Sequence, residues 1–149
     1  MSLTITSPAF ASGSPIPARF SCDGEDVSPA LAWKGAPTGT VSLALLVDDP
    51  DAPVGDWVHW IVFNLPADST GLPENAGPAG EPGRDGKNSW GRQGWGGPCP
   101  PGGRHRYFFK LFALDAVLDL PQGATKKQLL SAMQGHILAR AELMGTYAR

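Results

Sequence analysis

Apolar residues along this chain come in short runs separated by Gly, Pro, Asp and Asn, and they do not recur at helical spacing over most of its length. Residues 41–47 are largely apolar and precede a run of two aspartates and a proline, and residues 58–65 form a second run that ends at Pro66. Residues 106–115 alternate in polarity and are rich in aromatic side chains. Short apolar or alternating runs bounded by turn residues predict strands, with residues 41–47 central in a sheet.

Weaker runs predict the remaining strands. Residues 3–5, 17–20 and 31–33 each place apolar side chains next to turn residues, so we expect three short strands there. Residues 137–147 could continue a helix, but Gly145 and the Thr-Tyr pair after it favour a final strand.

One helix is predicted over residues 126–133. Thr125 stands at the N-cap position, Gln128 follows at the capping-box position, and Gly135 ends the pattern. Six or seven strands with a single helix predict a β-sandwich, because helices and strands do not alternate along the chain. With 149 residues, the chain 1–149 is expected to form one domain.

Composition excludes several classes of function. The net charge is −2, and no basic cluster is longer than Arg104-His105-Arg106, so nucleic acid is not an expected partner. No stretch approaches the ~20 apolar residues of a transmembrane helix. The N-terminal residues lack a basic leader and an apolar run, so no signal peptide is expected and the cytoplasm is the default location.

The chain has two cysteines, Cys22 and Cys99, without a Cys-x-x-Cys spacing. In a cytosolic protein the simplest interpretation is two reduced thiols. Both lie in polar, turn-like sequence, which leaves open that one or both line a site.

Residues 66–104 form a long stretch rich in Gly, Pro, Asn and Asp. An irregular segment of this length inside a compact domain is usually functional. Trp90 and Trp95 lie within it, and we expect them to tie the segment back onto the body of the protein.

The candidate chemistry begins at the end of the strongest strand. Asp49 and Asp51 are two residues apart, which in an extended segment puts both carboxylates on one side, and Pro50 and Pro53 stiffen the backbone that carries them. The same residues are also typical of a plain strand-ending turn, and that interpretation stays open.

Two of the three histidines lie close to predicted strand ends. His59 alone could be a buried core histidine, but His105 and Tyr107 stand at another strand entrance. Two imidazoles, two carboxylates, a phenol and a Gly-Pro loop would together suit a phosphate-sized anion.

Two other kinds of site remain open. Asp49, Asp51, His59 and His105 could hold a divalent metal ion, although their spacing matches no standard metal motif. A hydrolase could use a His-Asp pair, or Cys99 with His105 as its base, but no Gly-x-Ser-x-Gly elbow is present.

Four motifs occur in an order that resembles the phosphatidylethanolamine-binding protein family, in its bacterial and archaeal Raf-kinase-inhibitor-like branch. They are residues 20–29 (FSCDGEDVSP), residues 48–66 with DDPDAP, WVHW and NLP, residues 97–107 with GPCPP and HRY, and residues 141–147 (AELMGTY). Cys99 stands where eukaryotic members of the family have a second proline.

The resemblance implies a mainly β fold, a two-sheet antiparallel sandwich with Greek-key connections, and a small surface pocket. It implies a cis peptide bond at Ala52-Pro53, and Gly55-Asp56 is a further candidate for a strained or cis bond. Cys99 is expected as a free thiol at the pocket wall with Cys22 nearby. Ligand-binding residues implied by the family are Asp49, Asp51, Pro53, Trp57, His59, Gly97, Pro98, His105 and Tyr107, with the Gly97 backbone N–H facing the ligand and Asp51 in an orienting role. Cys99, which departs from the family pattern, is expected to join them as a ligand-binding residue of the wall.

The function implied is a non-enzymatic binding module for a phosphoryl or carboxylate group, as on a phospholipid head group, a phospho-compound or a phosphoprotein. No cofactor is expected. A regulatory or inhibitory action on a protein partner and a homodimer are left open. The alternative is a hydrolase with a His-Asp or metal-assisted site.

Overall fold

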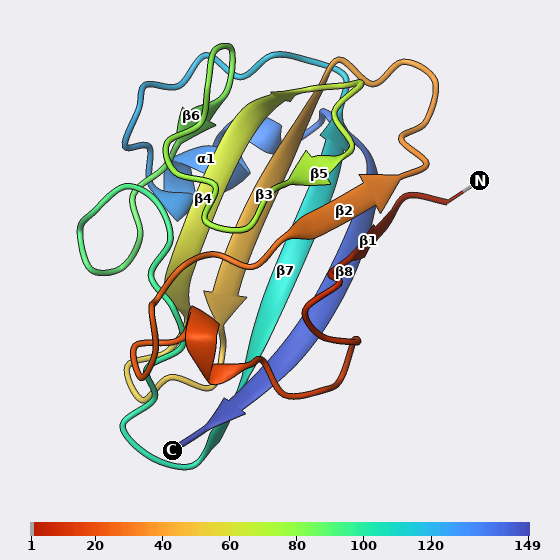
Figure 1. Cartoon of the computed structure of the whole chain (residues 1–149). Coiled ribbons are helices and arrows are strands. Elements are labelled where there is room, and N and C mark those ends of the chain that lie inside the picture. Colours follow the sequence, from red (N-terminus) through yellow and green to blue (C-terminus); the bar gives the residue numbers. More distant parts are fainter. Residues whose placement is uncertain (1) are drawn as a thin grey trace.

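The computed structural model describes residues 2–149 as two antiparallel sheets and one α-helix (Figure 1). The smaller sheet has the order β1-β2-β5, and its strands are β1 (Thr4–Thr6), β2 (Leu31–Lys34) and β5 (Gly71–Leu72). The larger sheet has the order β6-β4-β3-β7-β8, and its strands are β3 (Ser42–Asp49), β4 (Trp57–Pro66), β6 (Arg84–Asp85), β7 (Arg104–Leu114) and β8 (Ile137–Ala148). The predicted mainly β, two-sheet fold is confirmed.

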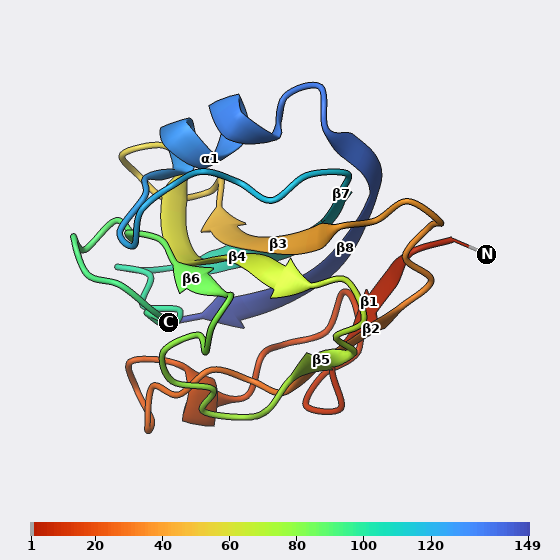
Figure 2. The ribbon, with the colours of Figure 1, turned by 90° about the horizontal axis from the view of Figure 1, so that it is seen from above.

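The larger sheet is covered on both faces, which Figure 2 shows as three layers. Leu43, Leu45 and Val47 of β3 pack into the core between the two sheets. Ala44 and Leu46 of the same strand face the other way and pack under α1 (Lys126–Met133). Because β3 is buried on both sides, its residues 43–47 are all apolar and do not alternate with polar residues. Each fully buried Leu or Val side chain contributes about 1.5–3 kcal/mol relative to exposure.

Helix α1 begins as the sequence predicts. The Thr125 hydroxyl accepts the backbone N–H of Gln128, and the Gln128 side chain accepts the backbone N–H of Thr125. Leu129 and Met133 bury one face of the helix against the larger sheet. Among residues 2–149, no helix is long and apolar enough to cross a membrane.

The strand predicted at residues 17–20 is wrong. Ala18–Phe20 form a 3₁₀ helix, η1, because Phe20 and Ser21 each donate a backbone N–H to the carbonyl three residues before them. Only Phe20 of this turn is buried, so a single apolar anchor, and not a ladder of strand pairs, holds the segment in place.

The long segment 66–104 contains the two-residue strands β5 and β6 and otherwise follows an irregular path. Trp95 stacks on Phe109 and meets Trp60 edge-on, with ring centroids 6.0 Å and 5.6 Å apart. This packing confirms that Trp95 ties the segment to the core. Trp90 remains 39% exposed and lies at the candidate site described next.

Candidate functional site

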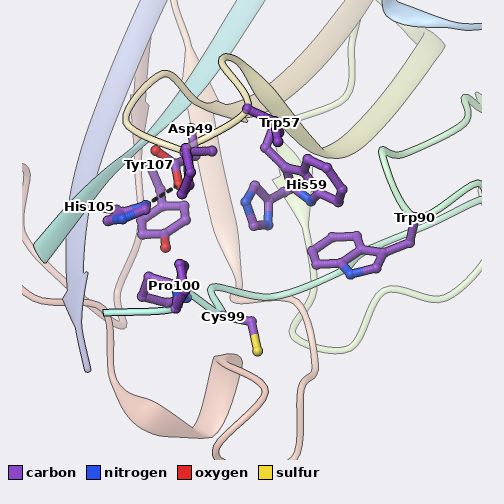
Figure 3. Close-up of a pocket in the computed structure, with 12 residues that line it drawn as sticks. Asp49, Trp57, His59, Trp90, Cys99, Pro100, His105 and Tyr107 are labelled. Carbon is purple, nitrogen blue, oxygen red and sulfur yellow. Dashed lines mark hydrogen bonds and ion pairs between the residues drawn. The ribbon is translucent and has the colours of Figure 1, made fainter. Parts of the chain in front are cut away.

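A cavity of about 250 Å³ opens at the end of the larger sheet where β3 ends and where β4 and β7 begin (Figure 3). Its polar side chains are Asp49, His59, His105 and Tyr107, which come from three adjacent strands. The remaining lining residues, mostly apolar, are Ala52, Pro53, Val54, Trp57, Trp90, Cys99, Pro100 and Pro101.

A bulge in β4 presents His59 to this cavity. Val47 pairs with Trp60 and the next residue, Asp48, pairs with Val58, so His59 is the extra residue in β4. An inserted residue of this kind re-aims a side chain relative to the regular alternation of a strand. The imidazole lies between the rings of Trp90 and Tyr107, with centroid distances of 5.1 Å to each.

Burial lowers the pKa of His59, so the neutral imidazole is favoured at pH 7. Its Nδ1 lies 2.7 Å from the carbonyl oxygen of Gly96. A carbonyl only accepts hydrogen bonds, so Nδ1 carries the proton and donates it there. Nε2 then holds the lone pair that a further proton would occupy.

Asp49 and His105 form a buried pair. The two side chains are 3% and 8% exposed, and Nδ1 of His105 lies 2.7 Å from Oδ2 of Asp49. Oδ1 of Asp49 accepts the backbone N–H of Asp51 at 2.8 Å. With both oxygens engaged, Asp49 fixes the orientation of His105, whose Nε2 remains available as a second ring nitrogen.

Tyr107 follows His105 by two residues on β7 and therefore lies on the same face of the sheet. Its hydroxyl is buried, and no group among the described residues forms a hydrogen bond with it. Burial, with a smaller effect of the Asp49 charge, raises the pKa of Tyr107 well above its usual value, so the group keeps its proton. A buried hydroxyl without a partner costs about 1–3 kcal/mol, which marks this position as one that a polar ligand would satisfy.

Asp51 does not line the cavity. Its carboxylate accepts hydrogen bonds from Nε and Nη2 of Arg106 at 2.9 Å each, and from the Arg106 backbone N–H at 3.0 Å. The hydrogen bond from the Arg106 side chain lowers the pKa of Asp51 to about 2. The two carboxylates therefore do not share one side, because β3 ends at Asp49 and the turn after it sends Asp51 toward β7.

Gly97 and Pro98 also lie outside the cavity lining. The backbone N–H of Gly97 donates to Oδ1 of Asp26 at 2.8 Å, so it does not face the cavity as the family resemblance implied. A Cβ at Gly97 would collide with the backbone oxygen of Phe20, which explains the glycine. Pro98 accepts the backbone N–H of Cys22 through its carbonyl.

Cys99 lines the cavity, but the prediction of a free thiol there is wrong. Cys22 and Cys99 form a disulfide with their Cα atoms 5.4 Å apart. The hydrogen bond from Cys22 to Pro98 holds the two segments at this separation, which lies in the range that a disulfide requires. The expected proximity of the two cysteines is confirmed, and the sulfur of Cys99 is not available as a nucleophile.

The loop between β3 and β4 forms the rim, where Pro53 and Trp57 lie. The predicted cis bond at Ala52-Pro53 is wrong, since the only cis peptide bond within residues 2–149 is Glu81-Pro82. Gly55 reverses the chain instead: its φ is 101° and its N–H donates to the carbonyl of Ala52 at 2.9 Å. Glycine adopts this conformation without strain, so the Gly55-Asp56 bond is neither cis nor strained.

Sequence reasoning missed the contribution of Trp90, Pro100 and Pro101 to the cavity. The Pro-rich stretch after Cys99 was the signal for Pro100 and Pro101. Among the residues that the structure describes, no group of three or more His, Cys, Asp or Glu side chains is placed to hold a metal ion. Of the four residues considered as metal ligands, Asp49, His59 and His105 line the cavity, whereas Asp51 lies outside it and pairs with Arg106.

The fold and this cavity define a class of protein: a two-sheet antiparallel sandwich with a small, polar-floored pocket at one end of the larger sheet. A family model for phosphatidylethanolamine-binding protein matches residues 6–148. The UPF0098 protein of Methanothermobacter thermautotrophicus is 54% identical over 144 residues, which cover 95% of each chain. The chain belongs to the phosphatidylethanolamine-binding protein family.

Two solved structures have the same fold. A phosphatidylethanolamine-binding protein homologue from Chlamydia trachomatis is 46% identical and aligns with a TM-score of 0.93 over 99% of this chain and 98% of that one. YbcL of E. coli, described as a new member of the mammalian family, is 32% identical with a TM-score of 0.93 over 100% of this chain and 99% of that one.

Proposed function

We propose that this protein is a non-enzymatic binding module whose pocket holds a phosphoryl or carboxylate group. The observation that carries this proposal is the buried hydroxyl of Tyr107, which lies beside the two histidines of the cavity and has no hydrogen-bond partner among the described residues. An anionic oxygen would accept this O–H, and a charge-assisted hydrogen bond of this kind contributes about 1.5–3 kcal/mol.

The histidines supply the compensating charge. Protonation of His59 at Nε2 is unfavourable in the buried ring, but a bound anion would favour it. His105, with its Nδ1 fixed on Asp49, presents Nε2 as a donor whenever the ring is protonated. The apolar wall formed by Pro53, Trp57 and Trp90 reduces access of water, so these interactions are stronger than they would be in bulk solvent.

The same chemistry recognises a phosphomonoester on a small molecule, a lipid head group or a protein. A cavity of about 250 Å³ has room for one such group. A ligand displayed on a protein would make this module regulatory or inhibitory toward that partner.

The test uses the two tyrosines of the chain as a matched pair. Tyr107→Phe removes the unpartnered hydroxyl in the cavity, whereas Tyr147→Phe removes a hydroxyl that bonds Asp23 and Ser21 outside it. Calorimetric titration with phosphate and phenyl phosphate at pH 6 should show affinity reduced by roughly 10–150-fold in Tyr107→Phe. Tyr147→Phe should keep the affinity of the wild type.

Stability should follow the opposite order. Tyr107→Phe removes a buried unsatisfied group and should not lower the free energy of unfolding, while Tyr147→Phe should lower it by about 1 kcal/mol. Equal affinities in Tyr107→Phe and the wild type would contradict the proposal. If the wild type hydrolyses phenyl phosphate specifically and His59→Gln does not, the protein is a hydrolase and the binding-module proposal is wrong.

A further inference from the structure

A second cavity, of about 280 Å³, shares no lining residue with the first. Three irregular segments, residues 26–28, 75–78 and 93–95, surround it, and Trp60 of β4 and Asp85 of β6 complete the wall. Nothing in the proposed anion site uses this cavity.

Asp85 is the unusual residue in this wall. It is 4% exposed, and its Oδ2 accepts the backbone N–H of Ala79 at 2.9 Å. Its Oδ1 is buried and has no hydrogen-bond partner within residues 2–149. Burial raises the pKa of Asp85, and the hydrogen bond from the Ala79 backbone opposes this effect only in part.

The only charged side chains that line this cavity are carboxylates. Asp26 supplies a second carboxylate, whose Oδ1 accepts the N–H of Gly97. No Lys, Arg or His is among the residues that line the cavity. The indole rings of Trp60 and Trp95 add apolar aromatic surface to the wall.

We propose that this second cavity binds a small organic ammonium group, with the unpartnered oxygen of Asp85 as its principal acceptor. Two carboxylates without a third ligand from His, Cys, Asp or Glu do not make a metal site in the described part of the chain. A guanidinium would require both oxygens of one carboxylate for its usual paired hydrogen bonds, and Oδ2 of Asp85 already accepts a backbone N–H. An ammonium needs only one acceptor oxygen at this position, and an aromatic wall suits its alkyl part.

The five tryptophans make the test specific. Trp60 and Trp95 line the second cavity, Trp57 and Trp90 line the first, and Trp33 lies in the core and lines neither. Propylammonium chloride is titrated into the ¹⁵N-labelled protein, and the indole N–H signals are followed. Sodium chloride controls for ionic strength, and 1-propanol controls for the alkyl group.

We expect saturable shifts at Trp60 and Trp95 with propylammonium, and none at Trp57, Trp90 or Trp33. Phosphate should produce the converse pattern, which separates this inference from the proposed anion site. Asp85→Asn should weaken propylammonium binding by at least about tenfold, whereas the exposed control Asp68→Asn should not change it.

If Asp85→Asn does not fold, Asp26→Asn serves as the second variant and should weaken binding by about threefold through the loss of one nearby charge. Three results would overturn the inference. They are the absence of saturable shifts in the wild type, equal shifts with 1-propanol, and unchanged propylammonium affinity in each folded variant.

Discussion

At the scale of the residue, His59 shows how a small irregularity creates a site. The bulge in β4 turns its ring toward the cavity, and the carbonyl of Gly96 fixes its tautomer. Neither the bulge nor the hydrogen bond to Gly96 can be predicted from the sequence, in which His59 is one polar residue in an apolar strand. His105 and Tyr107 could be predicted as neighbours, because alternate residues of a strand share a face.

The state of His59 leads to a prediction about protons. Since burial lowers its pKa, the free protein holds His59 neutral at pH 7, and a bound anion should raise that pKa. Anion binding should therefore take up a proton, and affinity should fall as pH rises from about 5.5 to 8.5, a range that brackets the ordinary pKa of histidine.

Sulfate is the suitable probe because its own charge does not change in this range. Calorimetry in buffers with different ionisation enthalpies measures the proton uptake directly. His59→Gln should bind more weakly and show a flatter dependence on pH. A wild-type affinity that stays constant across the range would show that neither histidine gains a proton on binding.

At the scale of the element, the loop between β3 and β4 is held by ion pairs at both ends. Asp51 joins its beginning to Arg106 of β7, and Lys126 of α1 contacts Asp56 near its end and the buried Asp48 of β3. Strands β3, β4 and β7 and helix α1 could be predicted because each has a clear apolar pattern or cap, and Gly145 with the Thr-Tyr pair after it favoured the final strand β8. The loop path could not, because it depends on partners that are 55 to 78 residues away in sequence.

Asp51 gives the prediction at this scale. Its folded-state pKa of about 2 lies below the ordinary 3.8, so the Asp51–Arg106 contact stabilises the fold fully above pH 4. That stabilisation is lost as pH falls through about 2. Because the pair is largely exposed, the effect should be small and should weaken further in salt.

Urea denaturation of the wild type and Asp51→Asn between pH 2 and 7 measures the difference. The free energy of unfolding should be higher for the wild type above pH 4, and the two proteins should converge near pH 2. The exposed Asp68→Asn is the control and should match the wild type at each pH. A difference that persists unchanged at pH 2 would exclude the ion pair as its cause.

At the scale of the whole molecule, the Cys22–Cys99 disulfide joins the segment after η1 to the wall of the first cavity. The sequence could not reveal it, because the cysteines are 77 positions apart and lack any spacing motif. The sequence-based expectation of a cytosolic location favours free thiols. Only the fold, which places Phe20 in the core and Cys22 against Pro98, brings the sulfurs together.

Closing a loop of this length restricts the unfolded chain, so removal of the disulfide should lower the free energy of unfolding by about 2–5 kcal/mol. Urea denaturation of the wild type with and without dithiothreitol, beside the Cys22→Ala/Cys99→Ala variant, measures this loss. Reduction should destabilise the wild type toward the level of the double variant, and dithiothreitol should not affect the double variant itself.

Reduction of the disulfide should also weaken ligand binding in the first cavity, because Cys99, Pro100 and Pro101 form one of its walls. Phosphate should bind the double variant severalfold more weakly than the oxidised wild type. Without the disulfide, the wall loses conformational freedom when phosphate binds, and this loss reduces the free energy of binding. Propylammonium binding at the second cavity, which Cys99 does not line, should change less. If free thiols are verified by mass spectrometry and stability and phosphate affinity both stay unchanged, the disulfide contributes neither to the fold nor to the site.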